Sequence, residues 1–200
     1  YYAIKEGGIP DKLITMLIEN GERSRSHGLS LKLLQKQAEA LDISLDTYAT
    51  SWADYEKKFV AALKKIKSDK INTGVFGDID IEDHREWVKK VCKKAEIAAV
   101  HPLWKKPRRE VLKEFIESGF KAVIVSLNSE SLDKSFLGRQ LDLDIIQEFE
   151  DIGIDPAGEN GEYHTVVIGG PIFKCDLNYT TGEIIQSSGY WFQDLSVIDS

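Results

Sequence analysis

The sequence predicts an α/β fold, with a parallel sheet that carries helices on both faces and a smaller α+β C-terminal lobe. Two observations predict it. In the first half of the chain, short apolar runs alternate with amphipathic segments of helical spacing, which is typical of strand–helix–strand units and a parallel sheet. In the second half, strand-like runs with turn residues between them follow the last helical segment, so a different, mixed lobe is expected there.

Composition and charge restrict the class of protein. The chain has 200 residues, 42% of them hydrophobic and 30% charged, which is enough for a core that folds without disulfides or metals. The net charge of -7, with no long basic block, argues against general nucleic-acid binding. Cys92 and Cys175 lie far apart and form no C-x-x-C pair, so we expect reduced thiols in a cytoplasmic protein. No apolar run approaches the roughly 20 residues that span a bilayer, so no membrane association is expected.

The first half of the chain supplies the elements of the parallel sheet. Strands are predicted at 12–20, 44–50, 72–78 and 96–103, and amphipathic helices at 30–41, 52–67 and 81–95, with Ser30 as N-cap of the first. The opening stretch YYAIKEGG is typical of the second half of a helix that ends at Gly7-Gly8, so we expect the chain to be a fragment of a longer protein. Ligands of such sheets bind beyond the carboxyl ends of the strands, here near Asn20, Thr50 and Gly77-Asp78.

The second half begins after a boundary near residues 101–107. Helices are predicted at 108–119 and 142–153, and a strand at 120–128. Strands after residue 164 are separated by turns at 169–171 and 181–182. The chain is therefore divided into a domain of residues 1–103 and a smaller lobe of residues 104–200.

One candidate site follows the strand at 72–78. Gly77 lets the backbone approach a ligand, and Asp78 could bind a hydroxyl or a metal ion. The alternative is structural: Asp80 or Asp83 caps the next helix, and the polar residues of that helix face water.

Two basic stretches are weaker candidates. Arg23, Arg25 and His27 could hold an anionic group after the first strand, or could form an ordinary polar loop before a helix. The stretch 101–110 carries four cations and Trp104, for which a linker with solvated charges is favoured over a phosphate contact.

The stretch GENGEYHT at 158–165 gathers carboxylates, an amide and an imidazole directly before an apolar run. An Asn160-Gly161 hairpin turn, with the glutamates facing water, is one interpretation. In the other, Glu159, Glu162 and His164 lie near one cleft, where carboxylates bind a cation, orient an amine or act as general base. Residues 162 and 164 share one face of a strand, which supports their convergence. The residue pattern leaves both interpretations open.

The stretch GENGEYHTVVIGGPIF (158–173) resembles the diphthine–ammonia ligase family. Further segments are similar to that family in the same order, from about the first helix to residue 173: HGLSLKLLQKQAEAL, GVFGDIDIEDHREWV, PLW, FIESGFKAVIV and LDKSFLGRQLD. The resemblance implies an N-type ATP pyrophosphatase domain (a PP-loop, HUP-like Rossmannoid fold) in residues 1–103. It implies that residues 104–200 form a substrate lobe.

The resemblance also implies an activity. ATP adenylates a carboxylate, pyrophosphate leaves, and ammonia attacks to give an amide, with Mg²⁺ expected to neutralise the phosphates. In the archetype the carboxylate belongs to diphthine on translation elongation factor 2. Implied cofactor-binding residues are Gly77, Asp78 and His27. Implied catalytic residues are Glu159, Glu162 and His164, with a glutamate as base for ammonium, and Asn160 and Gly161 are implied to bind substrate. No metal ligand is assigned.

Three departures from the family pattern keep alternatives open. The Ser-Gly-Gly-Lys-Asp-Ser type phosphate loop, expected just before Tyr1, is absent from this sequence, and Gly169 stands where the family usually has Asp. Asn160 and His164 replace residues of a GEGGEYET-like motif. This form resembles bacterial relatives, some of them linked to cobalamin metabolism, which implies a different acceptor such as a small molecule. The alternatives are a nucleotide-binding module without turnover and a structural domain with a glutamate-rich hairpin.

The aromatic pair Trp191 and Phe192 near the C-terminus has two interpretations, a homodimer contact or core packing.

Overall fold

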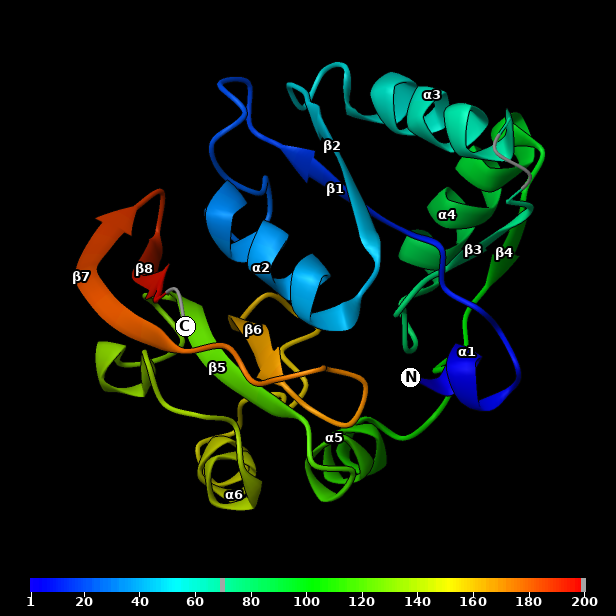
Figure 1. Ribbon diagram of the computed structural model, residues 1–200. Coiled ribbons are helices and arrows are strands. Elements are labelled where there is room, and N and C mark those ends of the chain that lie inside the picture. Colours follow the sequence, from blue (N-terminus) through cyan, green and yellow to red (C-terminus); the bar gives the residue numbers. More distant parts are fainter. Residues whose placement is uncertain (69–70, 199–200) are drawn as a thin grey trace. The chain divides into compact units, whose positions relative to one another are not determined.

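The computed structural model describes residues 1–68 and 71–198, and contacts divide the chain into two compact units (Figure 1). The first unit comprises Tyr1–Arg23 and Ile43–Lys106, and the second comprises Ser24–Asp42 and Pro107–Ser200. Residues 24–42 therefore pack with the C-terminal half of the chain. The functional division into residues 1–103 and 104–200 stays a prediction.

The first unit alternates helices with parallel strands, as expected for its sequence pattern. Its strands form two parallel pairs, β1 with β2 and β3 with β4. The elements are α1 (Tyr2–Lys5), β1 (Lys12–Leu17), β2 (Ser44–Ala49), α3 (Tyr55–Ser68), β3 (Thr73–Val75), α4 (Glu82–Ala95) and β4 (Ala98–Val100).

Helix α4 shows how the sequence specifies this unit. Val88, Val91, Cys92 and Ala95 recur at helical spacing and form one buried face, packed with Leu63 of α3. The capping prediction for this helix is wrong. Its N-cap is Ile81, which has no capping side chain. Of the acidic residues in the first turn, where negative charge is favourable to the helix dipole, Glu82 also pairs with Arg85 at 3.4 Å.

The second unit is an antiparallel four-stranded sheet with helices on both faces, and its strand order is β6-β5-β8-β7 (Figure 1). Its elements are α2 (Leu31–Leu41), α5 (Arg108–Glu117), β5 (Lys121–Asn128), the 3-10 turn η1 (Lys134–Phe136), α6 (Leu143–Asp151), β6 (Tyr163–Gly169), β7 (Tyr179–Ser187) and β8 (Tyr190–Val197). The predicted N-cap of α2 is confirmed, because Ser30 Oγ accepts a hydrogen bond from Leu33 N at 3.3 Å.

Strand β5 is buried on both faces, which explains its continuous apolar run. Ala122, Ile124 and Leu127 pack with α5 and α6, whereas Val123 and Val125 pack with α2. Figure 1 shows α2 on one side of this sheet and α5 and α6 on the other.

The turn predicted at Thr181-Gly182 is wrong. These residues lie inside β7, at a register shift, and the chain reverses at Ser188-Gly189 instead. Ser188 and Gly189 have φ values of 52° and 82°, and this two-residue loop with two positive φ angles matches the twist of paired strands.

Trp191 packs against the cluster on the α5–α6 face of the sheet, so core packing accounts for it. A homodimer stays a prediction.

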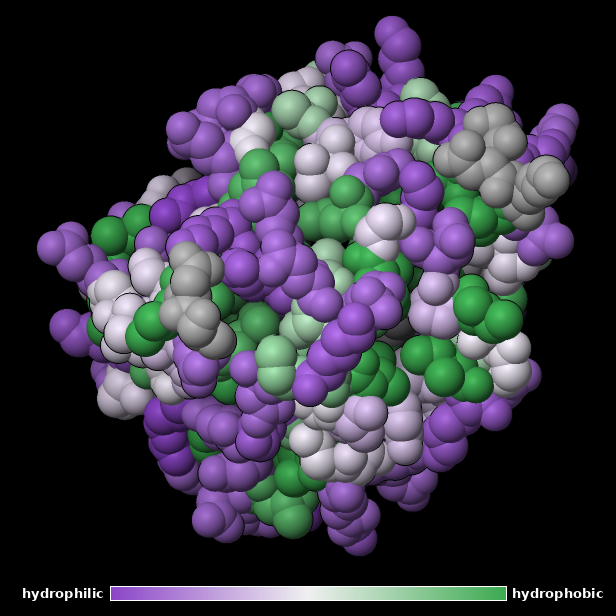
Figure 2. All heavy atoms as spheres, viewed as in Figure 1, coloured by the Kyte–Doolittle hydropathy of each residue, from purple (hydrophilic) through white to green (hydrophobic). Residues whose placement is uncertain are grey.

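Figure 2 shows that hydrophilic side chains cover most of the face in view, with hydrophobic side chains exposed between them in small groups. Among the described residues, none of the helices has the length and apolar character needed to cross a bilayer.

Candidate functional site

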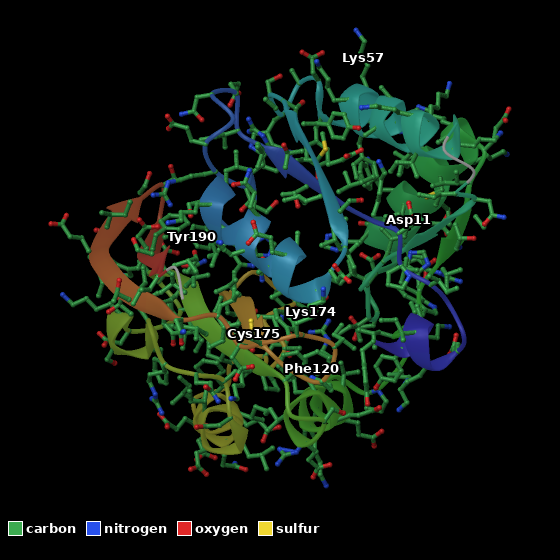
Figure 3. The ribbon with its side chains drawn as sticks, viewed as in Figure 1. Asp11, Lys57, Phe120, Lys174, Cys175 and Tyr190 are labelled. Carbon is green, nitrogen blue, oxygen red and sulfur yellow. The ribbon has the colours of Figure 1, made fainter. Side chains whose placement is uncertain are left out.

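The GENGEYHT stretch forms a tight turn between α6 and β6. Gly161 N donates to Gly158 O at 3.0 Å, and Gly158 and Gly161 have φ values of 66° and 85°, where a side chain would be strained. Tyr190, labelled in Figure 3, donates its hydroxyl to Gly161 O at 3.2 Å. The predicted turn is present, but a β-hairpin is wrong, because in the described part of the chain no strand lies between α6 and this turn.

Asp155 holds this turn together, and the sequence analysis missed it. Its Oδ1 accepts from Ala157 N at 3.1 Å and its Oδ2 accepts from Glu159 N at 2.9 Å. The Arg108 guanidinium lies 2.5 Å from the same Oδ2. The dipeptide Asp155-Pro156 is a known turn signal, since an aspartate bonds the backbone that follows it. That signal could have identified Asp155.

Tyr163 anchors the other end of the turn in the core. The centroid of its ring lies 5.0 Å from that of the Phe149 ring, and its hydroxyl donates a hydrogen bond to the Pro156 carbonyl. Burial raises the pKa of the Tyr163 phenol, which therefore stays protonated and keeps this hydrogen bond.

The Glu162 carboxylate stabilises the turn by hydrogen bonds to another residue of the same turn. It accepts hydrogen bonds from Asn160 N and Asn160 Nδ2, both at 3.1 Å. Strand β6 begins only at Tyr163, so Glu162 precedes the alternating part of the strand, and its carboxylate is directed to Asn160. The catalytic roles of Glu159 and Glu162, and the substrate-binding roles of Asn160 and Gly161, stay predictions.

His27 and His164 are in direct contact. Their ring centroids lie 4.7 Å apart with an interplanar angle of 65°. Burial lowers the pKa of both imidazoles, that of His164 to about 4, with His27 as a second cause. Both rings are therefore neutral at neutral pH. His27 belongs to the same unit as His164, and not to the unit that carries Gly77 and Asp78.

The loop that carries His27 is closed by Ser24, which is buried. Ser24 N donates to Leu29 O at 2.8 Å, and Ser24 Oγ accepts from Leu29 N at 3.0 Å. Gly28, the residue after His27, has a φ of 67°. It lies close to Phe192 of β8, since a Cβ at position 28 would be 3.5 Å from the ring of Phe192. The loop is thereby held against the α2 face of the sheet.

Ser126 of β5 occupies the central position of this face. It pairs with His164 of β6 and with Phe192 of β8, and it is fully buried. Within the described residues, its hydroxyl has no hydrogen-bond partner. The pairing of β5 with β6 is irregular between Ile124 and Ser126, and such bulges often occur beside functional sites.

Gly77 and Asp78 follow β3, and His101 follows β4, so all three lie at the carboxyl ends of neighbouring parallel strands. His101 Nε2 lies 3.4 Å from Asp78 Oδ2, and Phe76 stacks on the imidazole at 5.7 Å between centroids. A Cβ at Gly77 would meet no atom within 4 Å, so the backbone there adjoins open space. The sequence analysis missed His101, although the carboxyl-end rule applied to the strand at 96–103 would have found it.

Gly169 has a structural explanation. A Cβ there would lie 1.9 Å from Asp176 Oδ1, so the Asp176 carboxylate occupies the space of a side chain at 169. Asp176 also pairs with Lys121. In the same segment, Lys174 lies beside the end of α2 (Figure 3), with Nζ 2.9 Å from Asp42 Oδ1.

Within the described residues, no group of three or more His, Cys, Asp or Glu side chains is arranged to hold a metal ion. Asp78 is the carboxylate at the carboxyl ends of the strands that could contribute to a magnesium site.

Comparison with known proteins identifies relatives for both halves of the chain. Residues 1–99 match the diphthamide synthase N-terminal domain, and residues 107–199 match the diphthamide synthase C-terminal domain. The diphthine–ammonia ligase of Homo sapiens is 27% identical over 163 residues, which cover 78% of this chain and 61% of the relative. The Bos taurus enzyme is 26% identical over 166 residues with the same coverage. That of Schizosaccharomyces pombe is 30% identical over 110 residues, 52% of this chain and 18% of the relative. The chain thus spans less than two thirds of these relatives.

Proposed function

The chain belongs to the diphthamide synthase family, and from this premise we propose that it serves an ATP-dependent ligase that joins ammonia to a carboxylate. The observation that carries the proposal is the match of both halves of the chain to the two domains of that family. In the reaction, a carboxylate oxygen attacks the α-phosphorus of ATP and pyrophosphate leaves. The nitrogen lone pair of ammonia then attacks the acyl carbon, AMP leaves as the carbon–oxygen bond breaks, and a proton is lost to a base.

The first unit is proposed to bind the nucleotide. Gly77 adjoins open space at the carboxyl end of β3, and Asp78 offers a carboxylate there. Mg²⁺ typically takes one or two carboxylates and completes its shell with phosphates and water, so a single carboxylate is compatible with Mg²⁺·ATP. His101 follows the neighbouring strand with its Nε2 3.4 Å from Asp78 Oδ2, and its ring stacks with Phe76.

The second unit is proposed to serve the acceptor and ammonia. Glu159, Glu162 and His164 are the proposed catalytic residues, and Asn160 and Gly161 are proposed to bind substrate. The hydrogen bonds from Asn160 hold the Glu162 carboxylate in one orientation, which supports a role as an oriented base or ammonium ligand.

The relatives are named for diphthine and ammonia, and diphthine is therefore the first acceptor to test. Asn160 and His164 resemble the motif of relatives that would use another carboxylate acceptor. A small-molecule carboxylate is therefore the second acceptor to test. His27 remains a proposed cofactor-binding residue, although its contact with His164 favours a place on the ammonia side.

The full-length protein tests the proposal. Mg²⁺·ATP at 100 times its dissociation constant should add about 2.7 kcal/mol to the free energy of unfolding. Diphthine-bearing elongation factor 2 and ammonium chloride should then release pyrophosphate and form the amide. Glu162→Gln should lower the rate by about 10²–10⁴-fold if the carboxylate is the base. ATP binding without pyrophosphate release for any acceptor would indicate a binding module, and no effect of ATP on unfolding would refute nucleotide binding.

A further inference from the structure

Three polar side chains lie at increasing depth on the α2 face of the second unit's sheet. The outermost is His27, which is exposed as a whole residue, although its ring is partly covered where it lies edge-on against His164. His164 is half-buried in β6, and Ser126 is its fully buried cross-strand neighbour in β5. Cross-strand neighbours have Cβ atoms about 4.5–5.5 Å apart, so the Ser126 and His164 side chains lie next to each other on this face of the sheet.

The Ser126 hydroxyl is the second observation that points to a polar ligand at this place. A buried hydroxyl without a partner costs free energy, and proteins rarely retain one without a reason. In the described part of the chain this hydroxyl has none, and it lies beside an irregularity in the pairing of β5 with β6. Two independent observations, the unpartnered hydroxyl and the histidine pair, thus mark the same place.

The surroundings specify an uncharged ligand. Phe192 is the neighbour of Ser126 on β8, and Gly28 lies against Phe192, so an aromatic side chain adjoins the hydroxyl on this side. The carboxylate nearest in sequence, Glu162, is directed to Asn160. A cation in such surroundings would lose its hydration without a counter-charge, whereas a neutral molecule would not.

We propose that His27, His164 and Ser126 bind ammonia as the neutral NH₃ molecule. This inference rests on the proposed function, which makes ammonia a substrate. Ammonia has three N–H donors and one lone pair. The ring nitrogens of His27 and His164 accept from its N–H groups, and the Ser126 hydroxyl donates to its lone pair. Selection of NH₃ over ammonium delivers the nitrogen in the form that can attack an acyl adenylate.

The direct test uses the histidine rings as reporters. The chain has only four histidines, so each ring signal can be followed by ¹⁵N NMR of the full-length protein, with assignments from single variants. Ammonium chloride is titrated at two pH values one unit apart, with potassium chloride as the ionic control. The fraction of NH₃ rises about tenfold per pH unit below the pKa of ammonium. The signals of His27 and His164 should therefore reach half-saturation at about tenfold lower total ammonium at the higher pH, and those of His84 and His101 should not respond.

Shifts that follow total ammonium, shifts that potassium chloride reproduces, or the lack of any shift would overturn the proposal. Ser126→Ala should weaken the response of His164 at least tenfold while circular dichroism stays unchanged. The exposed His84→Ala is the matched control and should leave the response intact. An unaltered response in Ser126→Ala would also overturn the assignment of the hydroxyl.

A kinetic test separates this inference from the proposed function. Ser126→Ala and His164→Gln should each raise the KM for ammonium at least tenfold. The exposed control His84→Ala should leave both that KM and ATP–pyrophosphate exchange unchanged. If the wild-type protein forms amide and neither variant changes that KM, the ammonia site is refuted and the ligase stands. If the wild-type protein forms no amide with any acceptor, the ligase fails, and the NMR titration still decides the ammonia site.

Discussion

Ser126→Ala should make the ligand-free protein more stable, although it should weaken ammonia binding. The side chain is fully buried in β5, and within the described residues its hydroxyl has no partner. An unsatisfied buried polar group costs about 1–3 kcal/mol. Removal of one oxygen leaves only a small void, so the net gain should be about 1 kcal/mol, at the lower end of that cost. For a protein of this size, that gain raises Tm by about 2–4 °C.

A second serine of the same unit is the matched control. Ser24 is also buried, but its Oγ accepts a hydrogen bond from Leu29 N at 3.0 Å. Ser24→Ala removes that bond and should lower the free energy of unfolding by about 1 kcal/mol. Serine-to-alanine substitution should thus raise the free energy of unfolding at position 126 and lower it at position 24.

Urea denaturation followed by circular dichroism measures both variants, with equal m-values as the condition for comparison. A Ser126→Ala variant that is destabilised as much as Ser24→Ala would refute the reasoning, because it would mean that the hydroxyl has a partner in the ligand-free protein. Ammonium chloride at a high pH should narrow the difference between wild type and Ser126→Ala, since bound ligand stabilises only the protein that retains the site.

Three further predictions follow from burial and close contacts. The pKa of His164 is lowered from 6.5 to about 4 in the folded protein, so the folded state binds the proton less well than the unfolded state does. The contribution of the neutral imidazole to stability is therefore complete above pH 6.5 and is lost as the pH falls towards 4. His164→Gln should make the free energy of unfolding less dependent on pH over this range. Gly169→Ala should displace the Asp176 carboxylate and lower the free energy of unfolding by about 1 kcal/mol. In an Asp176→Gly background the same substitution should have no such effect, which a double-mutant cycle would measure. Burial raises the pKa of the Cys92 thiol to about 11, so native-state alkylation followed by mass spectrometry should label the exposed Cys175 and spare Cys92 until denaturant is added.

Most helices and strands of this protein were predictable because their signals are local. Apolar residues at helical spacing specify α4, a serine cap marks the start of α2, and a continuous apolar run marks the doubly covered β5. The loop at Ser188-Gly189 escaped prediction, because Thr181-Gly182 carries a similar local signal. The choice between them depends on the register of β7 with β8.

The candidate site was predictable only as a set of residue types. The glutamate-rich turn and the family were recognisable from the sequence, since a motif is a run of neighbouring residues. The contact of His27 with His164 was not, because it requires residues 24–42 to pack on the sheet of the second unit.

The sequence by itself determined the order and type of the elements, the family, and the motif that marks the proposed acceptor side. Only the tertiary structure decided which polar groups meet. Strand order places Ser126 beside His164, and a folded loop brings His27 onto that pair. The physical reason is that periodicity and capping act over a few residues, whereas burial, pKa and unpaired hydrogen-bonding groups depend on neighbours that are distant along the chain.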